Sequence, residues 1–576
     1  MDRSLRLAAC GQETVVRVRG SGRSAAVGVG LLLAAGLAVG GCGASSSPAP
    51  LACSAKAPAT GGAGAASGSA RAAGAAHPTA APGWTLPGGT LANTRDVASA
   101  INTSDVSKLG VAWTVPLRIP ITHTDGAYAA TPVVVNGVVY VQDLESNVMA
   151  ISLATGQVLW THTYNSPNGG PDGVNVANGV VYAATNHAAF ALSAATGRQL
   201  WIRTLIGNDH EGIDMAPGYD HGTVYVATVP VNPTVGEYLG GGKGILWALN
   251  AATGAPEWSW DEVQDLWGKP NINSGGGQWY PPSFDAQGNI YIGVANPAPL
   301  YGTPAYPWGS SRPGPNLYTD SVVKLSPQGK LLWYYQLTPH DLFDWDMQNP
   351  PVLTTANGQP VVIDGGKAGI LIELNARTGQ LLWKLPVGVH NGHDRDGLLT
   401  EYAKPASHVG LPKQFCLEPG AFGGVETQLA SNGSTTYAAV NDTPLPVCGT
   451  GQGCSISESA VIEDVIKGTG EMVAVNQDTG QLAWDTKLPS TPYGAATVTN
   501  DVVFTTTFHG DLYALNAATG AILFTTPLSA GTNAPVAVDG DYVIAGAGSP
   551  LSAQQQPMII AYKLGGTGKL PDTVGS

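Results

Sequence analysis

Short runs in which hydrophobic and polar residues alternate fill most of the chain, and this two-residue period is typical of β-strands with one face turned to a core. The run 148–153 (Val-Met-Ala-Ile-Ser-Leu) is an example. The run 132–141 contains Asn136-Gly137 between two apolar halves, and this pair favours the tight turn of a β-hairpin. The pattern therefore predicts an all-β protein built from hairpins.

One unit of this pattern repeats along the chain: an apolar strand, a turn that ends in Gly, and an aromatic residue four positions later. Because Gly can adopt positive φ, each turn closes a hairpin, and a further hairpin precedes most copies. Four strands per repeat form the blade of a β-propeller. The seven copies are Gly156 with Trp160, Gly197 with Trp201, Gly254 with Trp258, Gly329 with Trp333, Gly379 with Trp383, Gly480 with Trp484, and Gly520 with Phe524.

The two ends of the repeat region complement each other. Residues 109–113 match only the last strand of the unit, whereas 542–544 and 558–562 match earlier strands with no Trp strand after them. Joined, they make an eighth blade, so we predict an eight-bladed β-propeller whose ring is closed by the N-terminal strand. Successive motif glycines are 41, 57, 75, 50, 101 and 40 residues apart. The two longest gaps must contain inserted loops, where function concentrates.

Composition supports this fold and narrows the function. The 576 residues include 76 Gly and 42 Pro, and only 12% are charged, which argues against a helical bundle. A hydrophobic content of 43%, with 14 Trp and 20 Tyr, is sufficient for a large core. The net charge of −14 disfavours nucleic acid as a partner.

The first 42 residues are typical of an export signal, with a basic start and an apolar run at 25–39. Small residues before Cys42 resemble a bacterial lipoprotein signal, which implies a lipid on Cys42 and anchoring to the cell membrane on its extracytoplasmic face. A plain secretory signal cut nearby is the alternative. A membrane-spanning helix is disfavoured, because the apolar run is shorter than the ~20 residues that span a bilayer. We divide the chain into the signal (1–42), an Ala/Gly/Ser/Pro-rich tether (43–83), the propeller (84–566) and a tail (567–576).

The segment 338–346 (Thr-Pro-His-Asp-Leu-Phe-Asp-Trp-Asp) is the strongest candidate for chemistry. It holds three carboxylates and a His among aromatic residues, and such groups are costly to bury unless they bind a cation or one another. In an extended stretch, Asp344 and Asp346 would point to the same face and could flank a cation. Alternatively, these carboxylates cap backbone N–H groups of a loop.

The Gly-turn-Trp repeat resembles the tryptophan-docking motif of the quinoprotein dehydrogenases over residues 84–562. The resemblance implies pyrroloquinoline quinone (PQQ) with Ca²⁺ or a lanthanide, Asp344 as the general base close to the metal, and Asp346 as a metal ligand. It also implies Asn296, before a Pro, as a metal ligand. Glu237 resembles the family's metal-binding Glu, but the spacing to the following Gly-rich run is two residues longer than the family's, so an ordinary surface Glu is the alternative.

The resemblance also assigns two residues to the quinone. Trp279, after three glycines, matches the Trp whose ring forms the floor beneath the cofactor, and Lys367 matches a basic residue near the quinone oxygens. A structural Trp and a solvated turn Lys are the alternatives.

Other positions depart from the family pattern. An acidic cofactor contact falls on Ala129, an expected Arg is replaced by Asp172, and Pro315 stands where the family has Asp. No adjacent Cys pair is present, and no Cys-x-x-Cys-His motif that would attach haem. Part of the shell that binds the cofactor carboxylates is therefore absent.

Two further groups remain. The cluster 390–396 has two His and two Asp and could bind a transition metal, although short polar loops are common. In an oxidising exterior, Cys448 could pair with Cys454, or either could pair with Cys416.

Two functions follow. The first is an exported dehydrogenase that transfers hydride from an alcohol or sugar to metal-bound PQQ, with electrons leaving to a separate acceptor. The alternative is a non-enzymatic propeller lipoprotein that acts as a binding or assembly scaffold.

Overall fold

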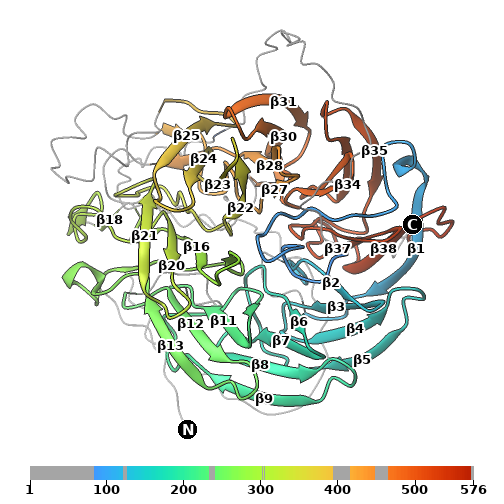
Figure 1. Ribbon diagram of the computed structural model, residues 1–576, viewed down its shortest axis with the longest axis horizontal. Helices are drawn as coiled ribbons and strands as arrows, with labels where there is room; N and C mark the ends of the chain where they lie inside the picture. The colour runs from blue at the N-terminus through green and yellow to red at the C-terminus, as the bar shows by residue number, and fades with distance from the viewer. Residues whose placement is uncertain are drawn as a thin grey trace, which may run out of the picture. The chain divides into compact units, whose positions relative to one another are not determined.

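The computed structural model describes residue 53 and the ranges 83–120, 126–231, 240–300, 302–303, 305–392, 415–447 and 465–571. The chain divides into the units Met1–Pro50 and Leu51–Ser576, and the described residues all belong to the second. This unit contains eight four-stranded antiparallel sheets arranged as blades around one axis (Figure 1). The predicted eight-bladed β-propeller is confirmed.

Seven blades follow the chain order, each starting with the strand nearest the axis. The strands are β2 (Val133–Val135), β3 (Val138–Gln142), β4 (Val148–Ser152) and β5 (Val158–His162); β6 (Asn175–Ala177), β7 (Val180–Ala184), β8 (Ala188–Ser193) and β9 (Gln199–Thr204); β10 (Gly218–Asp220), β11 (Thr223–Ala227), β12 (Ile245–Asn250) and β13 (Pro256–Asp261); β15 (Ser283–Phe284), β16 (Ile290–Val294), β20 (Ser321–Leu325) and β21 (Leu331–Gln336); β22 (Val352–Ala356), β23 (Gln359–Gly366), β24 (Ile370–Asn375) and β25 (Leu381–Pro386); β27 (Ala430–Ser431), β28 (Thr435–Asp442), β30 (Thr469–Asn476) and β31 (Gln481–Leu488); β32 (Thr497–Thr499), β33 (Val502–Thr506), β34 (Asp511–Asn516) and β35 (Ile522–Pro527).

The eighth blade joins the two ends of the propeller, as the repeat predicts. Its strands are β36 (Ala537–Asp539), β37 (Tyr542–Ala547), β38 (Met558–Leu564) and the N-terminal β1 (Leu109–Pro116). β1 is the outermost strand and pairs antiparallel with β38, with Leu109 opposite Leu564. This pairing closes the ring.

Smaller elements lie between the blade strands. They are the 3-10 helices η1 (Val106–Lys108) and η2 (Leu266–Gly268), and the two-stranded pairs β14 (Ser274–Gly275) with β17 (Pro297–Ala298), β18 (Gly302–Thr303) with β19 (Tyr306–Pro307), and β26 (Phe415–Leu417) with β29 (Leu445–Val447). All three pairs lie in the two long gaps of the repeat. No helix among the described ranges is long and apolar enough to cross a membrane.

The repeated Trp holds neighbouring blades together. A Cβ on each of the seven turn glycines would lie 2.5–2.7 Å from the indole ring of the preceding blade, so only Gly allows this contact. The indole N–H also donates to a backbone carbonyl of the next blade, as Trp383 Nε1 does to Gln477 O at 3.0 Å. The motif therefore encodes the interface between blades as well as the hairpin.

The axial segment (residues 84–101) closes the middle of the ring. Figure 1 shows this blue segment crossing the centre of the propeller. It exchanges backbone hydrogen bonds with the inner edges of six blades, at Val134, Phe284, Leu353, Ser431, Val498 and Gly540. The floor of any axial cavity is therefore made by the start of the propeller domain.

Candidate functional site

The Asp344 loop (residues 338–346) connects β21 to β22. Both carboxylate oxygens of Asp341 accept backbone N–H groups, from Phe343 at 2.8 Å and from Trp345 at 2.9 Å. Asp344 has a φ of 65°. The extended conformation expected for this stretch is therefore wrong, because Asp341 folds the chain back on itself. Of the three carboxylates, Asp341 does the capping that the alternative interpretation expected.

Asp344 and Asp346 nevertheless converge on one cation, the ammonium of Lys367. Lys367 Nζ lies 3.2 Å from Asp344 Oδ2 and 2.6 Å from Asp346 Oδ2. The other oxygen of Asp346 accepts the backbone N–H of Asn296 at 2.6 Å. Burial raises the pKa of Asp346 to about 7, and Lys367 opposes the rise. The fold thus brings four of the predicted site residues together, at the junction of the β15 and β22 blades.

A layer of buried charges lies behind this group. Arg312 is fully buried and donates to the backbone carbonyl of Asp341 at 2.6 Å. Asp320 is fully buried beside them, and burial with the nearby charges of Asp341 and Asp346 raises its pKa well above the usual range. Sequence analysis missed Asp320, because an Asp before a strand carries no signal of burial.

An apolar cover fixes the Asp344 loop from the other side. Most of the side chains that form it come from the loop and from the insert that carries β26 and β29, while Trp308 follows β19 and Ala368 lies between β23 and β24. The full set is Trp308, Leu342, Phe343, Trp345, Ala368, Phe415, Leu417, Ala421, Leu445 and Val447. Trp345 Nε1 also donates to Pro419 O at 3.1 Å. The longest insert of the repeat therefore packs against the candidate site.

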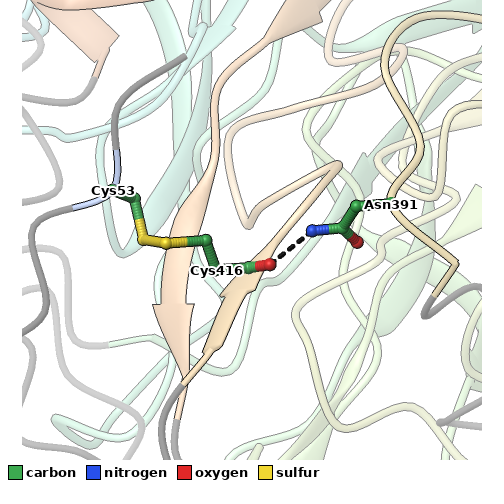
Figure 2. The surroundings of a disulfide bond; sticks show 3 residues. All are labelled: Cys53, Asn391 and Cys416. Atoms are coloured by element: carbon green, nitrogen blue, oxygen red, sulfur yellow. Dashed lines mark hydrogen bonds between the residues drawn. A yellow bond between two sulfur atoms is a disulfide. The ribbon is translucent and has the colours of Figure 1, made fainter. Parts of the chain in front are cut away.

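A disulfide attaches this insert to the region before the propeller. Cys416 on β26 is bonded to Cys53, 363 residues away in sequence (Figure 2). The carbonyl of Cys416 accepts a hydrogen bond from the side chain of Asn391. The alternative in which Cys416 pairs with Cys448 or Cys454 is therefore wrong, because Cys416 is bonded to Cys53. Cys448 and Cys454 themselves lie outside the described residues.

The glycine loop (residues 275–278) before Trp279 is held by a buried carboxylate. Glu262 accepts the Gly277 N–H at 2.5 Å and the Gln278 side-chain amide at 2.6 Å. A Cβ on Gly276 would lie 2.7 Å from Glu262 Oε2, and Gly277 has a φ of 126°. These glycines therefore allow the carboxylate to approach the loop. Sequence analysis missed Glu262.

An axial pocket lies beside this loop, at the entrances of the inner strands. Its lining is Pro87, Ala129, Thr131, Pro171, Asp172, Ala216, Tyr280, Pro281, Gln428 and Pro535. Tyr280 is one of its walls, whereas the adjacent Trp279 is half-buried and not part of the lining. Ala129 and Asp172, the two positions that depart from the family's cofactor contacts, both line this pocket.

Electrostatics connect the pocket to the group around Lys367. Burial and the negative charge of Glu426 raise the pKa of Tyr280, and the positive charges of Arg95 and Lys367 oppose the rise. Both cations therefore lie close enough to act on a group in the pocket wall.

Of the remaining predicted residues, some lie outside the described ranges and His390 lies within them. Glu237, Cys42 and positions 393–396 lie outside the described residues. The ring of His390 bonds to the carbonyls of Gly369 at 3.2 Å and Val387 at 3.0 Å, which fits a structural role in a turn.

The residues of the site suit the metal ion and the PQQ that the resemblance implies, except for Asp172. Asp344 and Asp346 supply the oxygen atoms that a hard cation prefers, although the described ranges contain no cluster of three or more His, Cys, Asp or Glu placed for a metal. An aromatic wall and two nearby cations suit a planar anionic cofactor. Asp172 does not suit an anion on its side of the pocket.

Comparisons with known proteins bear on the family and the fold. A model described as "Glucose/ethanol/alcohol dehydrogenase, beta-propeller domain" matches residues 84–186 and 214–388. A second, described as "Outer membrane protein assembly factor BamB", matches residues 145–274 and 468–556.

Two curated relatives extend over most of the chain. A quinohemoprotein alcohol dehydrogenase of Comamonas testosteroni is 28% identical, over 81% of this chain and 71% of its own length. A putative dehydrogenase XoxF of Paracoccus denitrificans is also 28% identical, over 77% of this chain and 82% of its own length.

Solved structures show the same architecture. The crystal structure of the Comamonas testosteroni enzyme superposes with a TM-score of 0.69 at 25% identity, covering 85% of this chain and 82% of that one. A europium-containing methanol dehydrogenase, at 20% identity, shares the fold with a TM-score of 0.66 over 84% of this chain and 98% of that one. By sequence and by fold, the chain is similar to PQQ-dependent quinoprotein dehydrogenases.

Proposed function

We propose that this protein oxidises the hydroxyl group of an alcohol or a sugar, with PQQ as hydride acceptor, a cation at Asp344 and Asp346, and a separate protein or small molecule that receives the electrons. The observation that carries the proposal is the convergence of Asp344, Asp346 and Lys367 beside the axial pocket. The curated relatives, named as alcohol dehydrogenases, support the same reaction class.

The two aspartates have different surroundings, which suggests different roles. The side chain of Asp344 is 13% exposed and that of Asp346 only 1%. Asp344 can therefore reach a substrate hydroxyl and accept its proton, as a general base must. Asp346, held by the N–H of Asn296, is better suited to bind Ca²⁺ or a lanthanide together with Asp344.

Lys367 would complete the site by placing positive charge beside the cofactor oxygens. Bound PQQ supplies the electron-accepting carbonyl for the hydride. A fixed ammonium stabilises the negative charge that develops on this acceptor. A metal ion held by Asp344 and Asp346 would replace the ammonium as their countercharge, and Lys367 would then be able to interact with the cofactor oxygens.

The test is reconstitution. Purified protein is combined with PQQ and Ca²⁺ or La³⁺, and dye reduction is measured with a panel of alcohols and sugars. Asp344→Asn should lower kcat by at least a thousandfold with PQQ affinity within a few-fold of the parent, while Asp105→Asn, an exposed aspartate paired with Lys108, should leave both unchanged. Equal turnover by the Asp344 variant would refute the assignment of the base.

The location is part of the proposal. The signal pattern before Cys42 supports export and a lipid anchor, and the Cys53–Cys416 disulfide supports an oxidising compartment. Labelling cells with a radioactive fatty acid should mark the parent protein and not Cys42→Ser. Equal labelling of both would exclude this anchor.

A non-enzymatic scaffold is the second candidate. It is favoured by the match to the assembly-factor model at residues 145–274 and 468–556, and by Ala129 and Asp172 in the pocket. Absence of PQQ binding with every metal tried would favour this function over the dehydrogenase.

A further inference from the structure

One face of the sixth blade (β27, β28, β30 and β31) gathers four charged side chains next to the fifth blade. Glu471 on β30 lies opposite Val440 on β28 and opposite Lys487 on β31. Because side chains alternate between the two faces of a sheet, Asp442 shares the face of Val440, and Asp485 shares the face of Lys487. Val440 packs in the apolar cluster that joins this blade to the fifth. The four charged side chains therefore lie at the junction of the two blades.

The three carboxylates of this group share one lysine. Lys487 Nζ contacts Glu471 Oε2 and lies 3.1 Å from Asp485 Oδ2. Its charge also acts on Asp442, as does that of His390, which follows β25. The side chain of Glu471 is only 3% exposed and Asp442 is also buried, so solvent screens their charges poorly. The carboxylates outnumber the ammonium, and their mutual repulsion favours the binding of protons.

Two of the carboxylates hold the start of the insert that carries β26 and β29. This insert begins after β25, where the N–H of Gly388 donates to Glu471 Oε1 at 2.9 Å. The N–H of Val389 donates to Asp442 Oδ1 at 3.0 Å. Gly388 has a φ of 81°, and a Cβ there would lie 2.8 Å from the side chain of Val440. Glycine thus permits the close approach, and the carboxylates fasten the first residues of the insert to the sixth blade.

The fastened segment is connected to the strand that covers the candidate site. Asn391 donates its backbone N–H to the carbonyl of Glu418 at 3.2 Å. Its side chain donates to the carbonyl of Cys416 on β26 (Figure 2). The neighbours of Cys416 on this strand, Phe415 and Leu417, pack in the apolar cover of the Asp344 loop. A change at the carboxylates can therefore reach this cover through Asn391.

Acidification acts on the group in a defined direction. Burial raises the pKa of Asp485 from 3.8 to about 6, and the charge of Asp442 adds to the rise. Burial also raises the pKa of Asp442, against the opposing effects of Lys487, the Val389 N–H and His390. Such carboxyl groups bind protons more tightly in the fastened state than in a detached one. For Asp485 the resulting stabilisation is complete below its ordinary pKa and is lost as the pH rises through about 6.

We propose a pH-sensitive latch that holds the start of the insert to the sixth blade more firmly in acidic than in neutral surroundings, formed by Asp442, Glu471, Asp485 and Lys487. The cover of the candidate site tightens with the latch, because Asn391 joins the latched segment to β26. The inference concerns the insert alone, so it stands or falls independently of the proposed function.

The experiment is hydrogen–deuterium exchange of the full-length protein at about pH 5.5 and about pH 7.5, with rates divided by the intrinsic exchange rate at each pH. The amides of Gly388 and Val389 should be protected about fourfold more at the lower pH, which is the change that one group with a pKa near 6 produces over this range. The amides of β26 should change in the same direction.

Asp485→Asn mimics the protonated acid, so this variant should show at the higher pH the protection that the parent reaches only at the lower one. Asp539→Asn is the matched control. Asp539 is also half-buried with a pKa raised by burial, but it lies on β36 in the eighth blade, so this variant should keep the pH dependence of the parent. Lys487→Met removes the ammonium and keeps the carboxylates, so the midpoint of the protection profile should move to higher pH.

Three results would contradict the latch or its reach. Equal protection of Gly388 and Val389 at both pH values in the parent would overturn the latch, and so would an unchanged pH dependence in Asp485→Asn. A response at Gly388 and Val389 without one at β26 would refute the connection to the cover of the candidate site.

Discussion

Replacing Lys367 by Met would test whether the two carboxylates beside it form a cation site. Met has a similar length and apolar stem, so packing changes little, but the ammonium between Asp344 and Asp346 is lost. Lys367 is well suited to this test because its side chain is only 9% exposed and Asp346 only 1%. The change therefore leaves two neighbouring carboxylates without a countercharge in a site that water hardly reaches.

The expected magnitude follows from that burial. Removing one partner of a buried ion pair destabilises a protein by about 3–5 kcal/mol, because the remaining charge is uncompensated. A metal ion that binds the two aspartates restores the countercharge, and a ligand of the folded state at a hundred times its Kd stabilises by about 2.7 kcal/mol. In the parent protein the metal must displace Lys367 first, so the gain is smaller there.

The assay is urea unfolding of chelator-treated protein, with and without La³⁺ or Ca²⁺. Lys324→Met is the matched control. Lys324 is also buried, lies 3.4 Å from Asp285 Oδ2 and packs over the ring of Tyr291, so its carboxylate partner is Asp285 and not Asp344 or Asp346. Both variants should lose stability, and only Lys367→Met should regain about half or more of the loss with metal. Equal metal responses of the two variants would refute a cation site at Asp344 and Asp346.

Three further predictions concern the supports of the site and the ring. Trp383→Phe should destabilise the protein more than Trp484→Phe, by about 1 kcal/mol in urea unfolding. Among the described residues, the carbonyl of Gln477 accepts a hydrogen bond only from Trp383, whereas the carbonyl of Ala517 accepts from both Trp484 and Tyr437. Equal losses of stability in the two variants would contradict this reasoning. Glu262→Ala should lower the free energy of unfolding by about 2–5 kcal/mol, since it leaves the backbone N–H of Gly277 and the side-chain amide of Gln278 unpaired. Unchanged stability would mean that the conformation of the glycine loop does not depend on Glu262. Cys53→Ser should increase proteolysis of the insert around β26 without altering the protease resistance of the blades, and identical digestion patterns would show that the disulfide is not needed there.

The ring could be predicted from sequence because its determinants are local and repeated. A Gly in a turn recurs in all seven copies, and a Trp follows four residues later in six of them. The contact of each turn Gly with the indole ring of the preceding blade then sets one blade against the next. The repeat also revealed the closure, since residues 109–113 match a last strand without a blade of their own. Phe524 marks the one copy without an indole N–H, and it precedes the blade assembled from both ends of the domain.

The site was less accessible from sequence, for a physical reason. Asp344 and Asp346 could be selected because carboxylates among aromatic residues are unusual, but Lys367 joins them from another blade and its partners could not be inferred from spacing. Asp320, Glu262 and Asp442 were missed altogether, because their roles come from burial and from partners that are distant in sequence, such as Val389, 53 residues from Asp442.

The two longest gaps of the repeat explain how a rigid ring acquires a site at one of its junctions. The gap of 75 residues contains Asn296 and Arg312, which lie beside and behind the Asp344 loop, and the gap of 101 residues contains the β26–β29 insert that covers it. Each insert starts and ends at strands fixed by Trp contacts, so the ring determines where the inserts meet. The catalytic geometry should therefore respond to changes in the two adjoining blades more than to equal changes across the ring. Trp333→Phe, on β21 at the contact between the fourth and fifth blades, should lower metal affinity more than Trp160→Phe in the first blade at a matched loss of stability. Equal effects of the two substitutions would show that the inserts position themselves without the ring.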